Sequence, residues 1–166
     1  MEEGIEVRLW NDQTGVYAAR EFEPGERVMF VEGDISDVPS RYSIQIGTDL
    51  HIHPRTPHTS WMYLNHSCVP NLAYDGPSAF MVAIELIHPG DQLTFNYLTT
   101  EWEMAEVFEC ACGYAGCFGR IAGYGHLGAA DRERLAREVL AHLRRLELNG
   151  IPGASEEAFR AASETP

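Results

Sequence analysis

The spacing of the four cysteines restricts how this 166-residue chain can fold. Cys110, Cys112 and Cys117 lie close together, whereas Cys68 lies far upstream. Zinc binds four thiolates in a tetrahedron, and an all-cysteine site of this kind is closed and structural. The alternatives are two disulfides or free buried thiols. Disulfides are less favoured than zinc in a chain without a secretory signal. The spacing therefore predicts a zinc site that ties the C-terminal part of the chain to its middle.

Length and hydropathy indicate a small globular protein. A chain of 166 residues is expected to form one domain with a modest core. The longest apolar run, from Phe80 to Ile87, already contains Glu85 and is too short to span a membrane. The acidic N-terminus, Met1-Glu2-Glu3-Gly4, lacks the basic start of a signal peptide. We therefore expect a cytoplasmic protein.

The net charge of −13 argues against a nucleic-acid ligand, because proteins that bind a phosphate backbone carry a basic patch. An acidic surface would attract a cationic partner instead, such as a lysine-rich peptide. The alternative is that the excess acid only keeps the protein soluble. The expected partner is thus basic, with no direct contact with nucleic acid or membrane, and the oligomeric state is left open.

Short strand-like runs separated by Gly and Pro turns fill residues 1 to about 100 and favour an all-β core over a parallel α/β sheet. The predicted strands are Ile5 to Leu9, Arg27 to Val31, Tyr42 to Ile46, Phe80 to Ile87 and Gln92 to Tyr97. The turns between them include Pro24-Gly25-Glu26 and His88-Pro89-Gly90-Asp91.

The end of the chain changes character. From about Ala129 to Leu148, apolar residues recur at steps of three and four, which predicts one amphipathic helix. The apolar residues are Leu135, Val139, Leu143 and Leu146. Gly150 and Pro152 are expected to end this helix. We interpret the apolar stripe as a packing face.

Four segments, in this order, resemble the SET-domain protein-lysine methyltransferases. They are Gly15 to Arg20 with Pro24-Gly25-Glu26, then Asn65-His66-Ser67-Cys68-Val69-Pro70-Asn71, then Pro89 to Tyr97, and last Cys110-Ala111-Cys112-Gly113 with Cys117-Phe118-Gly119. The match covers residues 5 to about 121, and the four segments together are far more specific than any one alone.

The resemblance implies a mainly β fold, the SET-domain β-clip of small curled sheets with a pseudo-knot, followed here by one C-terminal amphipathic helix. The segment from Asn65 to Asn71 is then expected to pass beneath the strand leading to Tyr97. Residues 1–121 would form the SET domain with its zinc-binding segment, and residues 122–166 a helical extension. The zinc ligands Cys68, Cys110, Cys112 and Cys117 would hold the knot closed.

The activity implied by the resemblance is methyl transfer from S-adenosylmethionine to a lysine amine. The amine must be neutral to react, and deprotonating a free lysine at about pH 7 costs about 4.6 kcal/mol. A narrow apolar channel lowers that cost because burial disfavours the ammonium form. Aromatic walls suit such a channel, since they exclude water and tolerate a cationic product.

The resemblance also assigns roles to individual residues. Tyr97 is the expected catalytic residue, although a half-buried strand tyrosine is the alternative. The expected cofactor-binding residues are Gly15, Tyr17, Tyr63, Asn65, His66, Tyr97 and Phe118. The expected walls of the substrate channel are Phe95, Tyr42 and Val31. Gly15 could equally be a turn glycine, and Phe95 a core residue. Phe95 in place of tyrosine implies that di- or trimethylation is possible.

Several positions depart from the family pattern. Asn96 replaces an aspartate, Val31 an aromatic residue and Met62 an arginine, and Gln13 stands where a second glycine is frequent. These changes bear on the substrate, so three hypotheses stay open: a protein-lysine methyltransferase, a methyltransferase of a small or carrier-bound amine, and a non-catalytic module that binds a basic peptide.

His51, His53 and His58 form a loose cluster in the sequence. Alternating histidines can share a metal, but no fourth ligand is apparent. We interpret this segment as a polar loop near the substrate groove.

Overall fold

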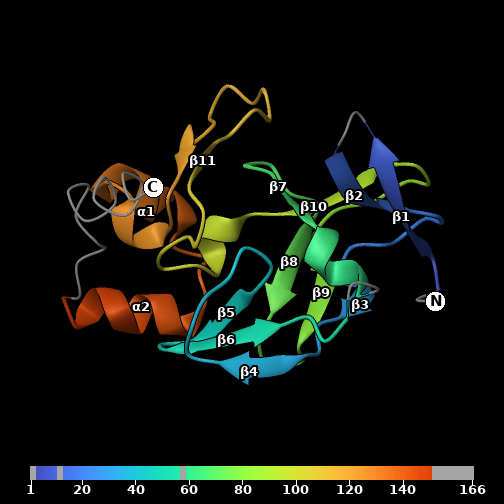
Figure 1. The fold of residues 1–166 in the computed structure, drawn as a ribbon. Coiled ribbons are helices and arrows are strands. Elements are labelled where there is room, and N and C mark those ends of the chain that lie inside the picture. Colours follow the sequence, from blue (N-terminus) through green and yellow to red (C-terminus); the bar gives the residue numbers. More distant parts are fainter. Residues whose placement is uncertain (1–2, 11–12, 57–58, 151–166) are drawn as a thin grey trace, which may run out of the picture.

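The computed structural model describes residues 3–10, 13–56 and 59–150, and its largest element is a seven-stranded sheet. Its strands run in the order β1 (Ile5–Trp10), β2 (Gln13–Ala18), β10 (Gln92–Phe95), β8 (Leu72–Asp75), β9 (Phe80–Ala83) and β3 (Arg27–Phe30), and β7 (Asn65–His66) also pairs with β10. The connections are mostly non-sequential, so the sheet joins distant parts of the chain (Figure 1).

Two smaller sheets flank this one. β4 (Asp34–Ser36), β6 (Leu50–His53) and β5 (Ile44–Gly47) form a three-stranded sheet, and β11 (Phe108–Glu109) pairs with β12 (Arg120–Ile121). The helical elements are η1 (Ser60–Tyr63), η2 (Tyr97–Thr99), η3 (Tyr124–His126), α1 (Ala129–Leu135) and α2 (Ala141–Leu148). Figure 1 shows the two α-helices at the end of the molecule opposite the β1–β2 hairpin. The predicted mainly β fold is confirmed.

The segment from Asn65 to Asn71 lies along β10, as the predicted knot requires. β7 pairs in parallel with β10, joining Asn65 to Thr94 and His66 to Phe95. The Asn71 amide continues this ladder: its Nδ2 donates to the Gln92 carbonyl, and its Oδ1 accepts from the Thr94 amide, each at 2.9 Å. The Asn71 side chain thus makes the hydrogen bonds with β10 that the backbone of a neighbouring strand would otherwise make.

Three predicted strands differ from the structure by two or more residues at one end. Strand β9 stops at Ala83 instead of Ile87, because the chain bends at Ile84 and Glu85 and Ile87 then pairs with Phe22. Strand β5 starts at Ile44, since the Ser40 hydroxyl accepts from the Tyr42 amide and holds that residue in a turn. The predicted strand from Gln92 to Tyr97 ends at Phe95, where the chain leaves the sheet.

The predicted single C-terminal helix is two helices. Residues 136–140 separate α1 from α2, and Leu140 has an extended backbone conformation. The Leu140 amide donates to the Thr99 carbonyl at 3.0 Å, a bond to another segment that an unbroken helix could not make. Contact with η2 therefore overrides the helical periodicity of the sequence.

Two clusters of buried apolar side chains make up the core. The first lies on the main sheet, and the second joins Leu98, Trp102 and Ile121 to the two helices. Tyr97 packs against both clusters, so this side chain lies at their junction. The boundary expected at residue 121 stays a prediction, and residues on both sides of it share the second cluster.

The two faces of α2 allow a matched test of this second cluster. Leu143 is 0% exposed and Leu148 is 87% exposed. Leu143→Ala should lower the free energy of unfolding by about 2–5 kcal/mol, because it removes buried methyl groups and leaves a cavity. Leu148→Ala should change it by about 0.5 kcal/mol or less. Urea unfolding followed by circular dichroism measures both, and equal effects would contradict the packing of α2 against the core.

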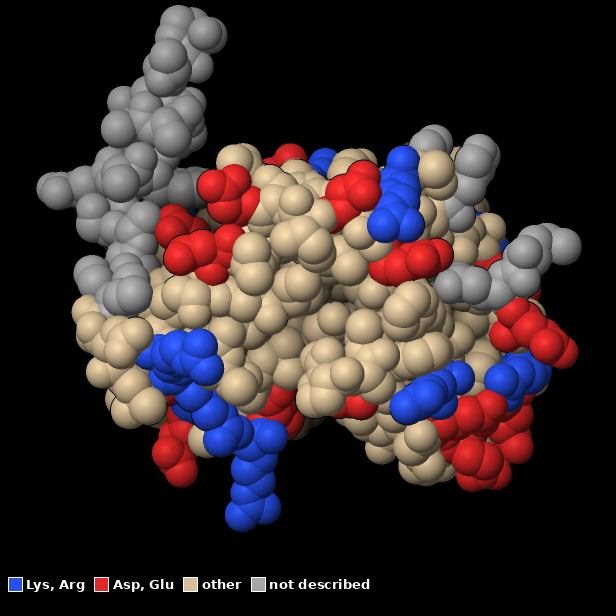
Figure 2. Space-filling view, turned by 90° about the horizontal axis from the view of Figure 1, so that it is seen from below, with Lys and Arg blue, Asp and Glu red and all other residues tan. Residues whose placement is uncertain are grey.

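In the described part of the chain, no helix has the length and apolar character needed to cross a membrane. Figure 2 shows one face of the molecule on which acidic and basic side chains lie around an uncharged middle. On this face, therefore, the net negative charge is not gathered into a single acidic patch.

Candidate active site and metal centre

A cavity of about 690 Å³ lies between the main sheet and the segment that follows η2. This volume is within the range of about 300–1,000 Å³ that is usual for small-molecule sites. Residues from five separate segments line it, among them Thr14, Tyr42, Tyr63, Asn65, His66, Phe95, Tyr97, Glu101 and Phe108. It therefore combines aromatic walls with polar and charged groups, among them Arg41 and Glu106.

Tyr97 begins η2 at one side of this cavity, and the preceding residue holds it there. Asn96 is buried and its Oδ1 accepts from the Leu98 amide at 3.1 Å, which caps the short helix. The Tyr97 hydroxyl donates to the Leu64 carbonyl at 2.6 Å. Burial, and to a lesser extent the nearby Glu101, raises the pKa of Tyr97. The phenol is therefore neutral at physiological pH and has a fixed orientation.

Three aromatic rings surround Tyr97. The ring centroids of Phe95, His66 and Phe108 lie 4.8, 5.2 and 6.1 Å from that of Tyr97. At these distances and with tilted or edge-on geometry, the rings attract one another and exclude water. Such a wall can hold an amine in its neutral form and also tolerate a cation against the ring faces.

His66 connects the tyrosine to the cysteine cluster. Its Nδ1 accepts from the Tyr97 backbone amide at 3.2 Å, and its Nε2 lies 3.3 Å from the Cys68 sulfur. Since Nδ1 is an acceptor, the hydrogen-bond pattern assigns the proton to Nε2, which then donates to the sulfur. Burial lowers the pKa of His66 to about 4, so the ring is neutral at pH 7.

The opposite side of the cavity is built by close contact between β2 and the start of β7. The Asn65 Nδ2 donates to the Thr14 carbonyl at 3.0 Å, and its Oδ1 accepts from Gln13 at 3.3 Å. A Cβ on Gly15 would come within 2.6 Å of the Gln92 side-chain nitrogen Nε2 and 3.1 Å of the Asn65 side-chain nitrogen Nδ2. Glycine at position 15 thus leaves room for these two side chains, which would have to move if a Cβ were present.

The four cysteine sulfurs come together at one point, all within 4.8 Å of one another. The Cys68 sulfur lies 3.7 Å from those of Cys110 and Cys117. Zinc–sulfur bonds of about 2.3 Å at tetrahedral angles place neighbouring sulfurs roughly 3.8 Å apart. All four cysteines are free, and the separations are too long for a disulfide of about 2.05 Å. The donor set and its spacing fit zinc.

The predicted site residues divide into two groups. Tyr42, Tyr63, Asn65, His66, Phe95 and Tyr97 line the cavity, whereas Gly15, Tyr17, Val31 and Phe118 are not among its lining residues. Val31 is 1% exposed and belongs to the main core. Phe118 lies under the Arg134 guanidinium, whose carbon is 4.2 Å from the ring centre.

Glu101 and Phe108 line the cavity but were not among the residues predicted from the sequence. Both had a sequence signal. Glu101 follows Tyr97 by four residues, which is one helical turn. Phe108 precedes the zinc segment by two residues, so a strand would place both Phe108 and Cys110 on the same face.

The histidine segment differs from its prediction as a polar loop. His51 and His53 lie in β6, where the His51 side chain is buried and the His53 ring contacts Ser40 and the Val38 carbonyl. Pairing with β4 on one side and β5 on the other makes this segment a central strand. His58 lies outside the described residues.

Comparisons with known proteins agree with this geometry. Residues 13–98 match the SET domain family. Methyltransferase flvH of Aspergillus flavus is 43% identical over 95 residues, which cover 55% of this chain and 51% of that protein. The H3 lysine-4 specific histone-lysine N-methyltransferase of Emericella nidulans is 34% identical over 64 residues, covering 34% of this chain and 5% of that protein. The chain thus spans about half the length of the first relative and a small part of the second.

The fold agrees with a solved structure as well. The crystal structure of KRYPTONITE in complex with mCHG DNA and SAH matches with a TM-score of 0.56 and 24% identity, over 70% of this chain and 28% of that one. At this identity the likeness concerns the fold alone. The resemblance predicted from the sequence motifs is confirmed by the family match, which covers more than half of the chain. The chain belongs to the SET domain family.

Proposed function

We propose that this protein is an S-adenosylmethionine-dependent N-methyltransferase whose acceptor is the side-chain amine of a lysine in a basic protein. The observation that carries the proposal is the position of the Tyr97 hydroxyl. It is held at 2.6 Å by the Leu64 carbonyl, within an aromatic cavity that also contains Asn65 and His66. A fixed, neutral phenol beside an apolar wall can orient a neutral amine and polarise its surroundings without removing a proton.

The residues near Gly15 fit the methionine part of the donor. The Gln13 side chain and the Thr14 carbonyl lie beside the Asn65 amide at one end of the cavity, and the close packing of Gly15 keeps this end narrow. Asn65 and His66 would hold the donor, and Phe108 would shield it from water. When bound, S-adenosylmethionine supplies an activated methyl group. Alignment of that group with the amine is worth on the order of 7–11 kcal/mol.

The cysteine cluster supports a bound zinc ion with a structural role. All four sulfurs belong to the protein, which leaves no open position for a substrate. A backbone hydrogen bond from Tyr114 lowers the pKa of Cys112, whereas burial raises the pKa of Cys68 and of Cys110. We propose that the zinc ion holds residues 108–121 against the cavity, because three of its ligands lie in that segment.

A small-amine methyltransferase is the second candidate. The relative with the higher identity is named a methyltransferase with no substrate stated, so that name is compatible with either acceptor. The histone-lysine relative matches over a shorter segment. Both candidates need the same amine chemistry, so the acceptor separates them.

Incubation with methyl-labelled S-adenosylmethionine tests the proposal. The acceptors are a library of lysine-containing peptides, and separately a panel of small primary and secondary amines. All twelve basic residues counted as Lys or Arg in this chain are arginines, so labelled lysine cannot come from the enzyme itself. Methyl-lysine found by mass spectrometry supports the first candidate, and labelled small amines alone support the second.

A third possibility is a binding module without activity, and cofactor affinity distinguishes it from the two methyltransferase candidates. S-adenosylmethionine at 100 times its dissociation constant should stabilise the folded protein by about 2.7 kcal/mol, seen as a higher melting temperature. A protein that binds the cofactor and methylates neither class of acceptor would contradict the proposed activity.

A further inference from the structure

Glu101 is a buried carboxyl group that lines the proposed amine cavity. Only 6% of the Glu101 surface is exposed, and this residue lines the same cavity as Tyr97 and Phe95. The Glu101 amide donates to the Tyr97 carbonyl at 2.9 Å, so the two residues are one helical turn apart. This spacing puts both side chains on the same side of the chain.

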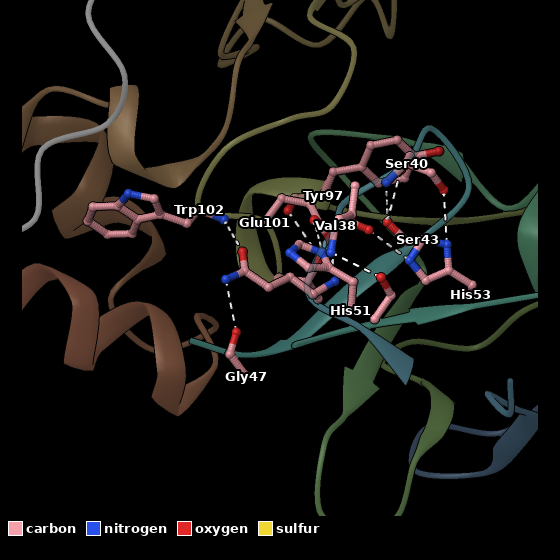
Figure 3. A network of polar contacts seen from close by, with 12 residues as sticks. Val38, Ser40, Ser43, Gly47, His51, His53, Tyr97, Glu101 and Trp102 are labelled. Carbon is pink, nitrogen blue, oxygen red and sulfur yellow. Dashed lines mark hydrogen bonds and ion pairs between the residues drawn. The ribbon is translucent and has the colours of Figure 1, made fainter. Parts of the chain in front are cut away.

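The two oxygens of Glu101 have different surroundings. Oε1 accepts a hydrogen bond from the Gln45 backbone amide at 2.8 Å and another from the Thr100 hydroxyl at 3.0 Å. Oε2 accepts no hydrogen bond from the described residues, and the His51 Nδ1 lies 4.0 Å from it. That nitrogen is itself buried without a hydrogen-bond partner in the described part of the chain. Figure 3 shows Glu101 within this network, between Trp102 and His51.

The groups that face Glu101 do not neutralise it. His51 of β6 is uncharged at neutral pH, since burial, and then the nearby His53 and His142, lower its pKa. Tyr97 of η2 is a neutral phenol, and His142 of α2 is directed at the Thr100 carbonyl at 2.7 Å. Arg41 forms an exposed ion pair with Glu106 at 3.3 Å.

Burial raises the pKa of Glu101 to about 7, despite the hydrogen bonds from Gln45 and Thr100 that lower it. A glutamine at this position could accept the same two hydrogen bonds and would avoid burying a charge. An unpaired buried charge is costly, and such groups with pKa values near 7 gather at functional sites. Among the described residues, none donates a hydrogen bond to Oε2, which is thus available to a substrate in the cavity.

We propose that Glu101 is the proton acceptor for the substrate amine, an inference that rests on the proposed N-methyltransferase function. The ammonium nitrogen loses one proton, which forms the O–H bond of the Glu101 carboxylic acid at Oε2. The lone pair left on nitrogen forms the bond to the methyl carbon while the carbon–sulfur bond breaks and its electrons remain on sulfur. The carboxylic acid then returns its proton to water through the cavity. The negative charge also attracts the ammonium form into the cavity before the reaction.

Glu101→Gln tests this role, because it keeps the shape and both hydrogen bonds to Oε1. The acceptors are poly-L-lysine and n-butylamine, and kcat/KM is measured from about pH 5.5 to 10. Near pH 8 the variant should lose about 100-fold in kcat/KM, a size usual for loss of a general base. The ratio of wild type to variant should fall below about pH 7, where Glu101 becomes protonated, and again near the amine pKa of about 10.4. Glu103→Gln, an exposed carboxyl outside the cavity lining, is the matched control and should stay within about twofold.

Thermal stability gives a readout that does not depend on activity. The folded-state pKa of Glu101 is raised above its ordinary value of 4.5, so the folded protein binds this proton more tightly than the unfolded chain. Stability from this group is therefore present below about pH 4.5 and lost as pH rises to about 7. Glu101→Gln should melt above the wild type at pH 8, and the two should converge at pH 4.5.

The outcomes are distinguishable. A pH-independent ratio, activity within about twofold of wild type, or a lower melting temperature of Glu101→Gln at pH 8 would overturn the role of Glu101 alone. A wild-type protein that methylates no amine would overturn the proposed function, and this role with it.

Discussion

Tyr97→Phe should reduce kcat at least about 100-fold while leaving the affinity for S-adenosylmethionine within a few-fold of wild type. The reason is that the variant keeps the ring, which contacts Phe95 and His66, and removes only the hydroxyl held by the Leu64 carbonyl. Removal of one such oriented hydrogen-bonding group in other enzymes costs about 10²–10³ in kcat. Cofactor affinity is measured by calorimetry and turnover by release of labelled product.

Tyr74→Phe is the matched control for this prediction. Tyr74 is also buried, but it lies in the main core and is not among the residues that line the cavity. It should keep turnover within about twofold, which separates the loss of a buried hydroxyl in general from the loss of this one. Turnover of Tyr97→Phe close to wild type would mean that the phenol only supports the fold at the junction of the two cores.

Removal of the metal should unfold the segment from Phe108 to Ile121 and abolish cofactor binding. Structural zinc sites contribute about 10–16 kcal/mol in zinc-finger peptides, as much as the whole stability of an ordinary domain. Phe108, Cys110 and Cys112 line the cavity, so one of its walls depends on this segment. Elemental analysis should find one zinc ion per chain, and a chelator should lower the melting temperature until zinc is restored.

Cys68→Ser is the variant that isolates the link between the metal centre and the tyrosine. It removes a ligand and also the sulfur that lies 3.3 Å from the His66 ring, whose other nitrogen holds the Tyr97 amide. We expect loss of zinc and of cofactor binding together. Tyr114→Phe, a half-exposed residue in the same cysteine segment, should change neither. Full zinc content and activity in Cys68→Ser would contradict a four-cysteine site.

The cysteine cluster and Tyr97 are thus joined through the ring of His66. Neutral His66 lies between the Cys68 sulfur and the Tyr97 amide, and the edges of its ring also pack against Phe108. This arrangement accounts for the two-residue spacing of His66 and Cys68, since the His66 ring contacts both the Cys68 sulfur and the Tyr97 amide. It also predicts that disorder in residues 108–121 changes the position of Tyr97 without any change in the main sheet.

Local pattern alone was sufficient for the features that depend on residue type and spacing. Thiolates select zinc by chemistry, so Cys68 and the three later cysteines could be assigned to one site before their separations were known. Alternation and turn residues likewise located most strands, although not all of their ends. Ile87 shows why: it follows a bend in the chain and pairs with Phe22, a partner distant in sequence.

The sequence by itself determined the family, the mainly β fold and the identity of the four sulfur ligands, since these follow from short motifs and from ligand chemistry. Only the tertiary structure decided that the C-terminal helix breaks at Leu140, that Val31 is core, and that Glu101 and Tyr97 line one cavity. Each of these depends on contacts between segments far apart in the chain. Burial raises the pKa of Glu101 to about 7, and no pattern of neighbouring residues specifies that burial.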